Sequence, residues 1–90
     1  MRNTGATFDR LHAAIDGDNP LDLRFRELRN CASLLEMHVA EEESDPLIID
    51  AIGSLFAQLA KLRGLPDDRC REAARVIDQT KKLPPRSAHR

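Results

Sequence analysis

Aromatic side chains are scarce in this sequence. Its 90 residues include three Phe and no Trp or Tyr. Flat aromatic side chains are what proteins commonly use to stack on exposed bases and to anchor tight interfaces. Their scarcity argues against the binding of RNA or single-stranded DNA as the main function.

The sequence also lacks a long apolar run. No stretch approaches the roughly 18 consecutive apolar residues of a membrane-spanning helix. The first ten residues, MRNTGATFDR, contain no apolar segment of the kind that secretory signals carry. We therefore expect a cytoplasmic protein that makes no contact with a membrane.

Cysteine is equally sparse, with Cys31 and Cys70 as the two thiols. Each falls on the apolar face of a different expected helix, which is typical of small core residues in a reducing compartment. A chain of 90 residues can bury a modest core without disulfides or a metal. A disulfide framework is therefore not expected.

The charges nearly balance, giving a formal net charge of −1. No global attraction to nucleic acid or anionic lipid follows from that value, but the charges are unevenly distributed. The segment from Glu36 to Asp50 is acidic, and the segment from Lys81 to Arg90 is basic. We interpret the basic end as a solvated tail, with phosphate or acidic-protein binding as the alternative.

Residues 45–65, DPLIIDAIGSLFAQLAKLRGL, predict the central helix of the fold. Asp45 suits the N-cap, Pro46 the first helical position, and Gly64 the left-handed position that ends a helix. Apolar residues recur at steps of four and three, at Ile48, Ile52, Leu55, Leu59 and Leu62. Four more widen this seam beyond half of the circumference: Ile49, Ala51, Phe56 and Ala60. Such a helix must pack against neighbouring elements on several sides.

Two helices are expected before the central one. The first is short, begins at a Thr7 cap and ends at Gly17. Asn19 followed by Pro20 again combines a cap with a first-turn proline, and a four-three apolar spacing carries the second helix to Glu43. This second helix is expected to be the longest in the fold.

A fourth helix is expected to start at Leu65 and Pro66 and to stop at the Pro-Pro pair. Linkers of two to four residues place successive helices antiparallel to one another. The sequence therefore predicts an all-α fold with one domain over residues 1–90. Three main helices form a compact antiparallel bundle, a short N-terminal helix lies across them, and the tails at 1–6 and 84–90 are disordered.

No stretch carries a complete catalytic, metal or cofactor motif. Residues 16–27 are acidic at positions one, three and twelve of a calcium loop, but Pro20 and Leu21 replace an oxygen ligand and the required glycine. His38 and Glu41 have a helical spacing that would suit a metal or acid-base pair, but the Glu-x-x-His motif of di-metal bundles is absent. No glycine-rich phosphate or oxyanion loop is present. We expect a non-enzymatic protein with no cofactor.

Residues 59–73, LAKLRGLPDDRCREA, resemble the helix-turn-helix pattern of bacterial repressors. Ala60 and Gly64 have the spacing of four that this pattern requires. The resemblance implies a DNA-binding regulator, acting as a dimer, whose DNA contacts come from Arg69, Arg71 and Arg75. Asp67 and Asp68 in the first turn of the reading helix would repel phosphates, so this reading is the alternative hypothesis.

The favoured hypothesis is a small protein-interaction module of bacterial or phage type: an adaptor, inhibitor, antiactivator or chaperone. It would act as a homodimer and dock a hydrophobic helix surface on a partner protein, because the fourth helix is too narrow to cover the central one. The expected interface residues are Leu34, Met37, Ile48, Ile49, Ile52 and Phe56. The residues expected to steer basic partners toward that interface are Glu41, Glu42, Glu43 and Asp45.

Overall fold

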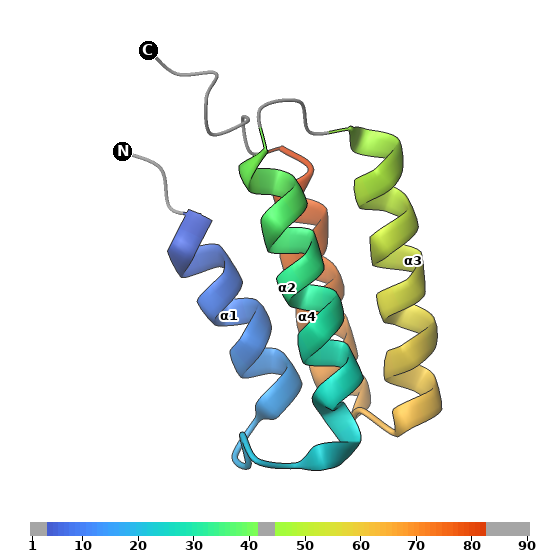
Figure 1. Ribbon diagram of the computed structural model, residues 1–90. Helices are drawn as coiled ribbons and strands as arrows, with labels where there is room; N and C mark the ends of the chain where they lie inside the picture. Colours follow the sequence, from blue (N-terminus) through green and yellow to red (C-terminus); the bar gives the residue numbers. More distant parts are fainter. Residues whose placement is uncertain (1–3, 42–44, 83–90) are drawn as a thin grey trace.

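Figure 1 shows the computed structural model of the protein, which describes residues 4–41 and 45–82. Its four helices are α1 (Thr4–Asp16), α2 (Arg26–Ala40), α3 (Pro46–Arg63) and α4 (Asp67–Thr80). A 3-10 turn, η1 (Leu23–Phe25), leads into α2. The helices run alternately down and up, and this arrangement confirms the predicted all-α antiparallel bundle.

The four helices surround one hydrophobic core. α1 packs against α4 and α2, α2 packs against α3, and the junction of α3 with α4 is looser than those of α1 with α4 and of α2 with α3. The largest fully buried apolar side chains are Phe8, Leu11, Ile15, Leu28, Leu35 and Val76. Three of these six come from α1, so the N-terminal helix supplies as much of the core as its neighbours do.

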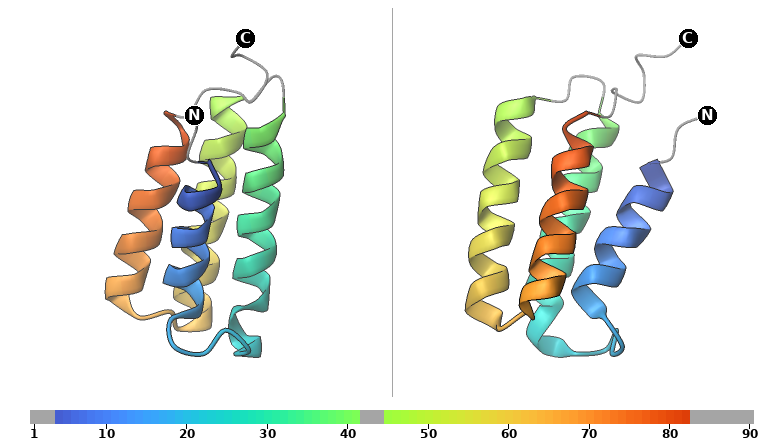
Figure 2. Two further views of the ribbon diagram at one scale, coloured as in Figure 1. Left: turned by 90° about the vertical axis from the view of Figure 1, so that its left-hand side faces the viewer. Right: turned by 180° about the vertical axis from the view of Figure 1, so that it is seen from behind.

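The first helix is therefore a full member of the bundle. It has 13 residues, close to the 14 of α4, and lies lengthwise beside α4 and α2 instead of across them (Figure 2). Its helical conformation begins at Thr4, so the predicted disorder of residues 1–6 is wrong for residues 4–6. Residues 1–3 and the predicted tail at 84–90 lie outside the described part of the chain.

α3 begins and ends where the sequence predicts. The Asp45 carboxylate accepts a hydrogen bond from the Leu47 N–H at 2.9 Å, and Pro46 occupies the first turn. Gly64 is left-handed, with φ of 78°. The Gly64 N–H donates to the Lys61 carbonyl at 3.3 Å, and the Leu65 N–H donates to the Ala60 carbonyl at 2.9 Å. These two bonds form a Schellman motif, which satisfies carbonyls at the helix end.

The second helix starts later than its proline signal predicts. Asn19 Oδ1 does accept a hydrogen bond from the Leu21 N–H at 3.2 Å, but no α-helix follows. Instead, Asp22 accepts from the Arg24 N–H at 3.0 Å and pairs with the Arg24 guanidinium at 2.7 Å, which caps η1. Leu21 and Leu23 are 82% and 73% exposed, so the first residues of the apolar pattern bury nothing that would favour a helix there.

The second helix also ends earlier than expected. Glu41 is extended, with φ of −73° and ψ of 158°, so α2 stops at Ala40 instead of Glu43. α2 has 15 residues and α3 has 18, which makes the prediction that the second helix is the longest wrong.

Candidate functional site

Three of the six predicted interface residues belong to the core. Ile49, Ile52 and Phe56 are 4%, 8% and 3% exposed, and they lie on the face of α3 that points into the bundle. Their assignment to an accessible docking surface is therefore corrected. The physical reason is that α1 joins α2 and α4 as a full-length helix around the core that this face of α3 points into.

Large apolar side chains remain on a neighbouring face of the same helix. Ile48, Leu55 and Leu62 are 44%, 47% and 71% exposed. They are spaced seven residues apart, so they form a nearly straight stripe along α3 that drifts by only about 20° per step. Residues on the opposite shoulder, such as Gly53 and Ala57, face α4. The stripe therefore lies on the shoulder of α3 that faces α2.

α2 adds two more exposed side chains beside this stripe. Leu34 is 49% exposed and Met37 is 63% exposed. The α3-facing edge of α2 is marked by Glu27, which pairs with Arg63 at the end of α3. Leu34 lies seven residues after Glu27 and therefore on the same edge. We call the combined surface the α2–α3 apolar face, defined by Leu34, Met37, Ile48, Leu55 and Leu62.

Two of the four predicted acidic residues, Glu41 and Asp45, lie at one end of the α2–α3 apolar face. The Glu41 side chain is 65% exposed and follows the last turn of α2, and Asp45 caps α3. Glu42 and Glu43 lie outside the described residues. The structure therefore places two of the four expected steering residues beside Ile48, and this end of the face is acidic.

His38 connects α2 to the start of α3. Its Nε2 accepts a hydrogen bond from the Asp45 N–H at 3.0 Å, and its Nδ1 lies 3.6 Å from Glu41 Oε1. These contacts assign the proton of a neutral imidazole to Nδ1. Among residues 4–41 and 45–82, no three His, Cys, Asp or Glu side chains come together as a metal site would require. Asp16, the first residue of the calcium-like run, pairs with Arg29.

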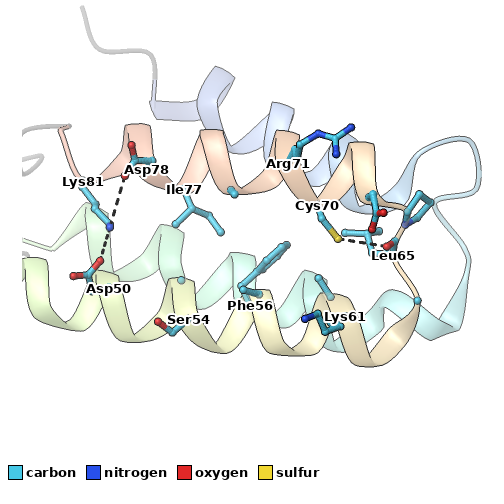
Figure 3. A pocket seen from close by; sticks show the side chains of 17 residues that line it. Asp50, Ser54, Phe56, Lys61, Leu65, Cys70, Arg71, Ile77, Asp78 and Lys81 are labelled. Atoms are coloured by element: carbon cyan, nitrogen blue, oxygen red, sulfur yellow. Dashed lines mark hydrogen bonds and ion pairs between the residues drawn. The ribbon is translucent and has the colours of Figure 1, made fainter.

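A groove of about 900 Å³ separates α3 from α4 (Figure 3). Its apolar lining includes Phe56, Ala60, Leu65 and Ile77. At one end Lys81 pairs with Asp50 on α3 and lies 3.7 Å from Asp78 on α4, so the ammonium ties the two lips together. The sequence pattern does not predict this groove, although the fourth helix is expected to be too narrow to cover the central one.

Both thiols contact backbone carbonyl oxygens. Cys31 Sγ is buried 3.7 Å from the Ile52 carbonyl, and Cys70 Sγ lies in the groove 3.4 Å from the Leu65 carbonyl. Burial raises the pKa of the Cys31 thiol. Burial also raises the pKa of the Cys70 thiol, and the nearby Asp67 and Asp68 carboxylates add to that rise. Both side chains are therefore protonated at neutral pH, which disfavours nucleophilic chemistry.

The arginines of the alternative DNA-binding hypothesis do not all share one surface, because Arg69 lies apart from Arg71 and Arg75, which are four residues apart on α4. Arg69 packs over Gly17 and lies 3.9 Å from Asp18, Arg75 pairs with Glu72 at 2.5 Å, and Arg71 lines the groove. α3 and α4 also run antiparallel and side by side, as Figure 3 shows. The two helices of a helix-turn-helix motif cross instead at roughly 90–120°. The arrangement of α3 and α4 therefore differs from that of a helix-turn-helix motif.

The chain matches no known family model, and comparisons with curated proteins and with solved structures give no match either. Within the described residues, no helix combines the length and the apolar character needed to cross a bilayer.

Proposed function

We propose that this chain is a small, non-enzymatic protein-interaction module that docks another protein chain on its α2–α3 apolar face. The observation that supports this proposal most strongly is the gathering of five large apolar side chains, each 44% exposed or more, on two neighbouring helices. Single exposed apolar residues are common on protein surfaces, but a contiguous group of this size marks an interaction site.

The size of the face sets what the partner must provide. Together the five side chains expose on the order of 500 Å², near the upper end of the largest patch on a typical monomer. At about 25 cal/mol per Å², covering that area contributes roughly 12 kcal/mol. Association itself costs an estimated 4–15 kcal/mol, so a partner of closely matched shape is needed. An adaptor, inhibitor, antiactivator or chaperone acts through such a surface.

Charge around the face favours a partner with a basic patch. Glu41 and Asp45 lie at the end of the face that carries Ile48. Charges at the rim of an interface raise the association rate more than the final affinity, and salt screens them. We therefore propose a cytoplasmic adaptor, inhibitor, antiactivator or chaperone whose partner carries a basic patch.

The test places a photo-activated cross-linking amino acid at position 55 in cells that express the chain, with position 54 as the matched control. Leu55 lies on the face, whereas Ser54 lines the groove on the other shoulder of α3. We expect a covalent adduct with a protein from position 55, at several times the yield obtained from position 54. Equal yields from the two positions, or no adduct from position 55, would refute the proposal.

A further inference from the structure

We propose that the chain docked on the α2–α3 apolar face is a second copy of this protein, with the two α3 helices packed antiparallel about a two-fold axis at Leu55. This inference rests on the proposed docking function and names the occupant of the face. Three features of α3 support it: the spacing of its exposed residues, the pairing of side-chain sizes, and the charges at its two ends.

The spacing of the stripe is symmetric about its middle residue. Ile48 precedes Leu55 by seven residues, and Leu62 follows it by seven. An antiparallel pairing centred on Leu55 therefore places the two Leu55 side chains against each other and Ile48 against the partner's Leu62. Each copy then presents the same patch to the other, as the two-fold symmetry of a homodimer requires. A repeat of seven residues also suits helices that cross at about 20°.

Side-chain sizes complement one another in the same register. Ala51 is exposed, and this pairing sets it opposite the partner's Leu59, a larger side chain that is packed partly against the core. The most exposed residue of the stripe, Leu62, meets Ile48, one of its less exposed residues. Ridges of large side chains on each helix therefore pack into grooves between side chains of the other helix, as in ordinary helix–helix packing.

Charges at the ends of α3 favour the antiparallel arrangement over a parallel one. Near Ile48 the described charges are those of Glu41 and Asp45, which sum to −2. Near Leu62, Arg63 is paired with Glu27, and Lys61, which lines the groove on the other shoulder, leaves this end of α3 with a net charge of +1. An antiparallel dimer brings each acidic end to a basic end and also opposes the two helix dipoles. A parallel dimer would place like charges together.

The area also suits a small dimer. Two copies of the face bury on the order of 1,000 Å² of large apolar side chains, which approaches the standard range of about 1,200–2,000 Å² before any polar atoms are counted. The groove between α3 and α4 lies on the other shoulder and stays open in this arrangement.

Cysteine cross-linking in the purified chain tests the register. Leu55→Cys, Ile48→Cys and Leu62→Cys are each made in a Cys70→Ser background, with Ser54→Cys as the control that points elsewhere. All four positions are exposed, so the substitutions leave the core intact. Under mild copper-catalysed oxidation by air, we expect Leu55→Cys to form a disulfide dimer at least tenfold faster than Ser54→Cys. Ile48→Cys and Leu62→Cys should cross-link slowly alone and rapidly when mixed.

Two results would overturn the proposal. Self-linking of Ile48→Cys as fast as that of Leu55→Cys would indicate a parallel pair, and a Leu55→Cys rate equal to that of Ser54→Cys would exclude contact between α3 helices. The docking function itself would survive either result if photo-cross-linking at position 55 gave an adduct with a different protein. It would fall only if that separate experiment failed.

Discussion

The two shoulders of α3 differ in the size of their side chains. Toward α4 the helix presents Gly53 and Ala57, and a groove of about 900 Å³ lies there. Toward α2 it presents Ile48, Leu55 and Leu62, which protrude into solvent. The small residues therefore line the groove, and the large ones, Ile48, Leu55 and Leu62, form an exposed ridge along α3. A helix from another chain packs through such ridges, so the comparison supports the side of α3 that we propose as the interface.

The largest expected difference in stability is between substitutions at two adjacent residues of α3. Phe56→Ala should lower the free energy of unfolding by about 3–5 kcal/mol, because Phe56 is only 3% exposed and its removal leaves a cavity in the core. Leu55→Ala should lower the stability of the monomer by no more than about 1 kcal/mol, because Leu55 is already 47% exposed and Ala favours the helix. Urea unfolding at a low protein concentration, at which any dimer dissociates, measures both. Equal losses would mean that the ridge belongs to the core of the monomer.

A second pair of substitutions compares the shoulders directly. A Cβ atom at Gly53 would lie 3.1 Å from Ile77 Cγ2, so Gly53→Leu should overpack against α4 at a cost of about 1–3 kcal/mol, of which removing a glycine from the helix offsets about 1 kcal/mol. Ala51→Leu adds a large side chain on the exposed, α2-facing side and should stay within about 0.5 kcal/mol. Thermal unfolding of the two variants gives the difference. A Gly53→Leu chain as stable as Ala51→Leu would show that α3 and α4 separate easily.

Thiol reactivity compares the junctions on the two sides of α3. Cys31 lies buried at the α2 junction, whereas Cys70 lines the open groove at the α4 junction. Iodoacetamide should modify Cys70 at least tenfold faster than Cys31. Both should react more slowly than a small free thiol, because burial raises the pKa of each. Mass spectrometry after timed quenching measures the rates, and equal rates for the two cysteines would contradict a closed α2–α3 junction.

The smallest expected effect is on the pH dependence of stability, through the ion pairs of Lys81 at one end of the groove. The hydrogen bond to Asp50 raises the pKa of the Lys81 ammonium above its ordinary value of about 10.4, and Asp78 adds to this rise. The stabilisation is therefore complete below the ordinary pKa and is lost as the pH rises through the higher, folded-state pKa. Lys81→Met should show a shallower alkaline loss of stability than the wild type in urea titrations. Identical pH profiles would show that this ion pair does not tie the lips in solution.

Local signals predicted the limits of α3 but not those of α2. Asp45 and Gly64 satisfy backbone groups of the helix they bound, so short-range hydrogen bonding fixes both ends. Asn19 and Pro20 carry the same kind of signal, but Asp22 and Arg24 form a competing turn three residues later. Competition between neighbouring caps depends on side-chain geometry, which a residue pattern does not contain.

The face that each apolar residue of α3 occupies was harder to predict. The four-three pattern grouped Ile48 and Leu55 with Ile52, and the structure places only Ile52 of these three in the core. Nearly every side of the helix is apolar, so the pattern predicts its burial but not its rotation about its own axis. The rotation depends on packing against α1, α2 and α4. The repeat of seven from Ile48 to Leu62 does not distinguish the two groups, because Ile49 and Phe56 in the core have the same spacing.

Sedimentation equilibrium of the unmodified chain tests most directly whether the ridge on α3 pairs with a second copy. At about 100 μM, where a dimer of micromolar affinity is largely formed, the account predicts a mass of twice 10.1 kDa. It predicts the mass of one chain for Leu55→Glu and the dimer mass for Ser54→Glu. A single-chain mass for all three proteins would contradict the account.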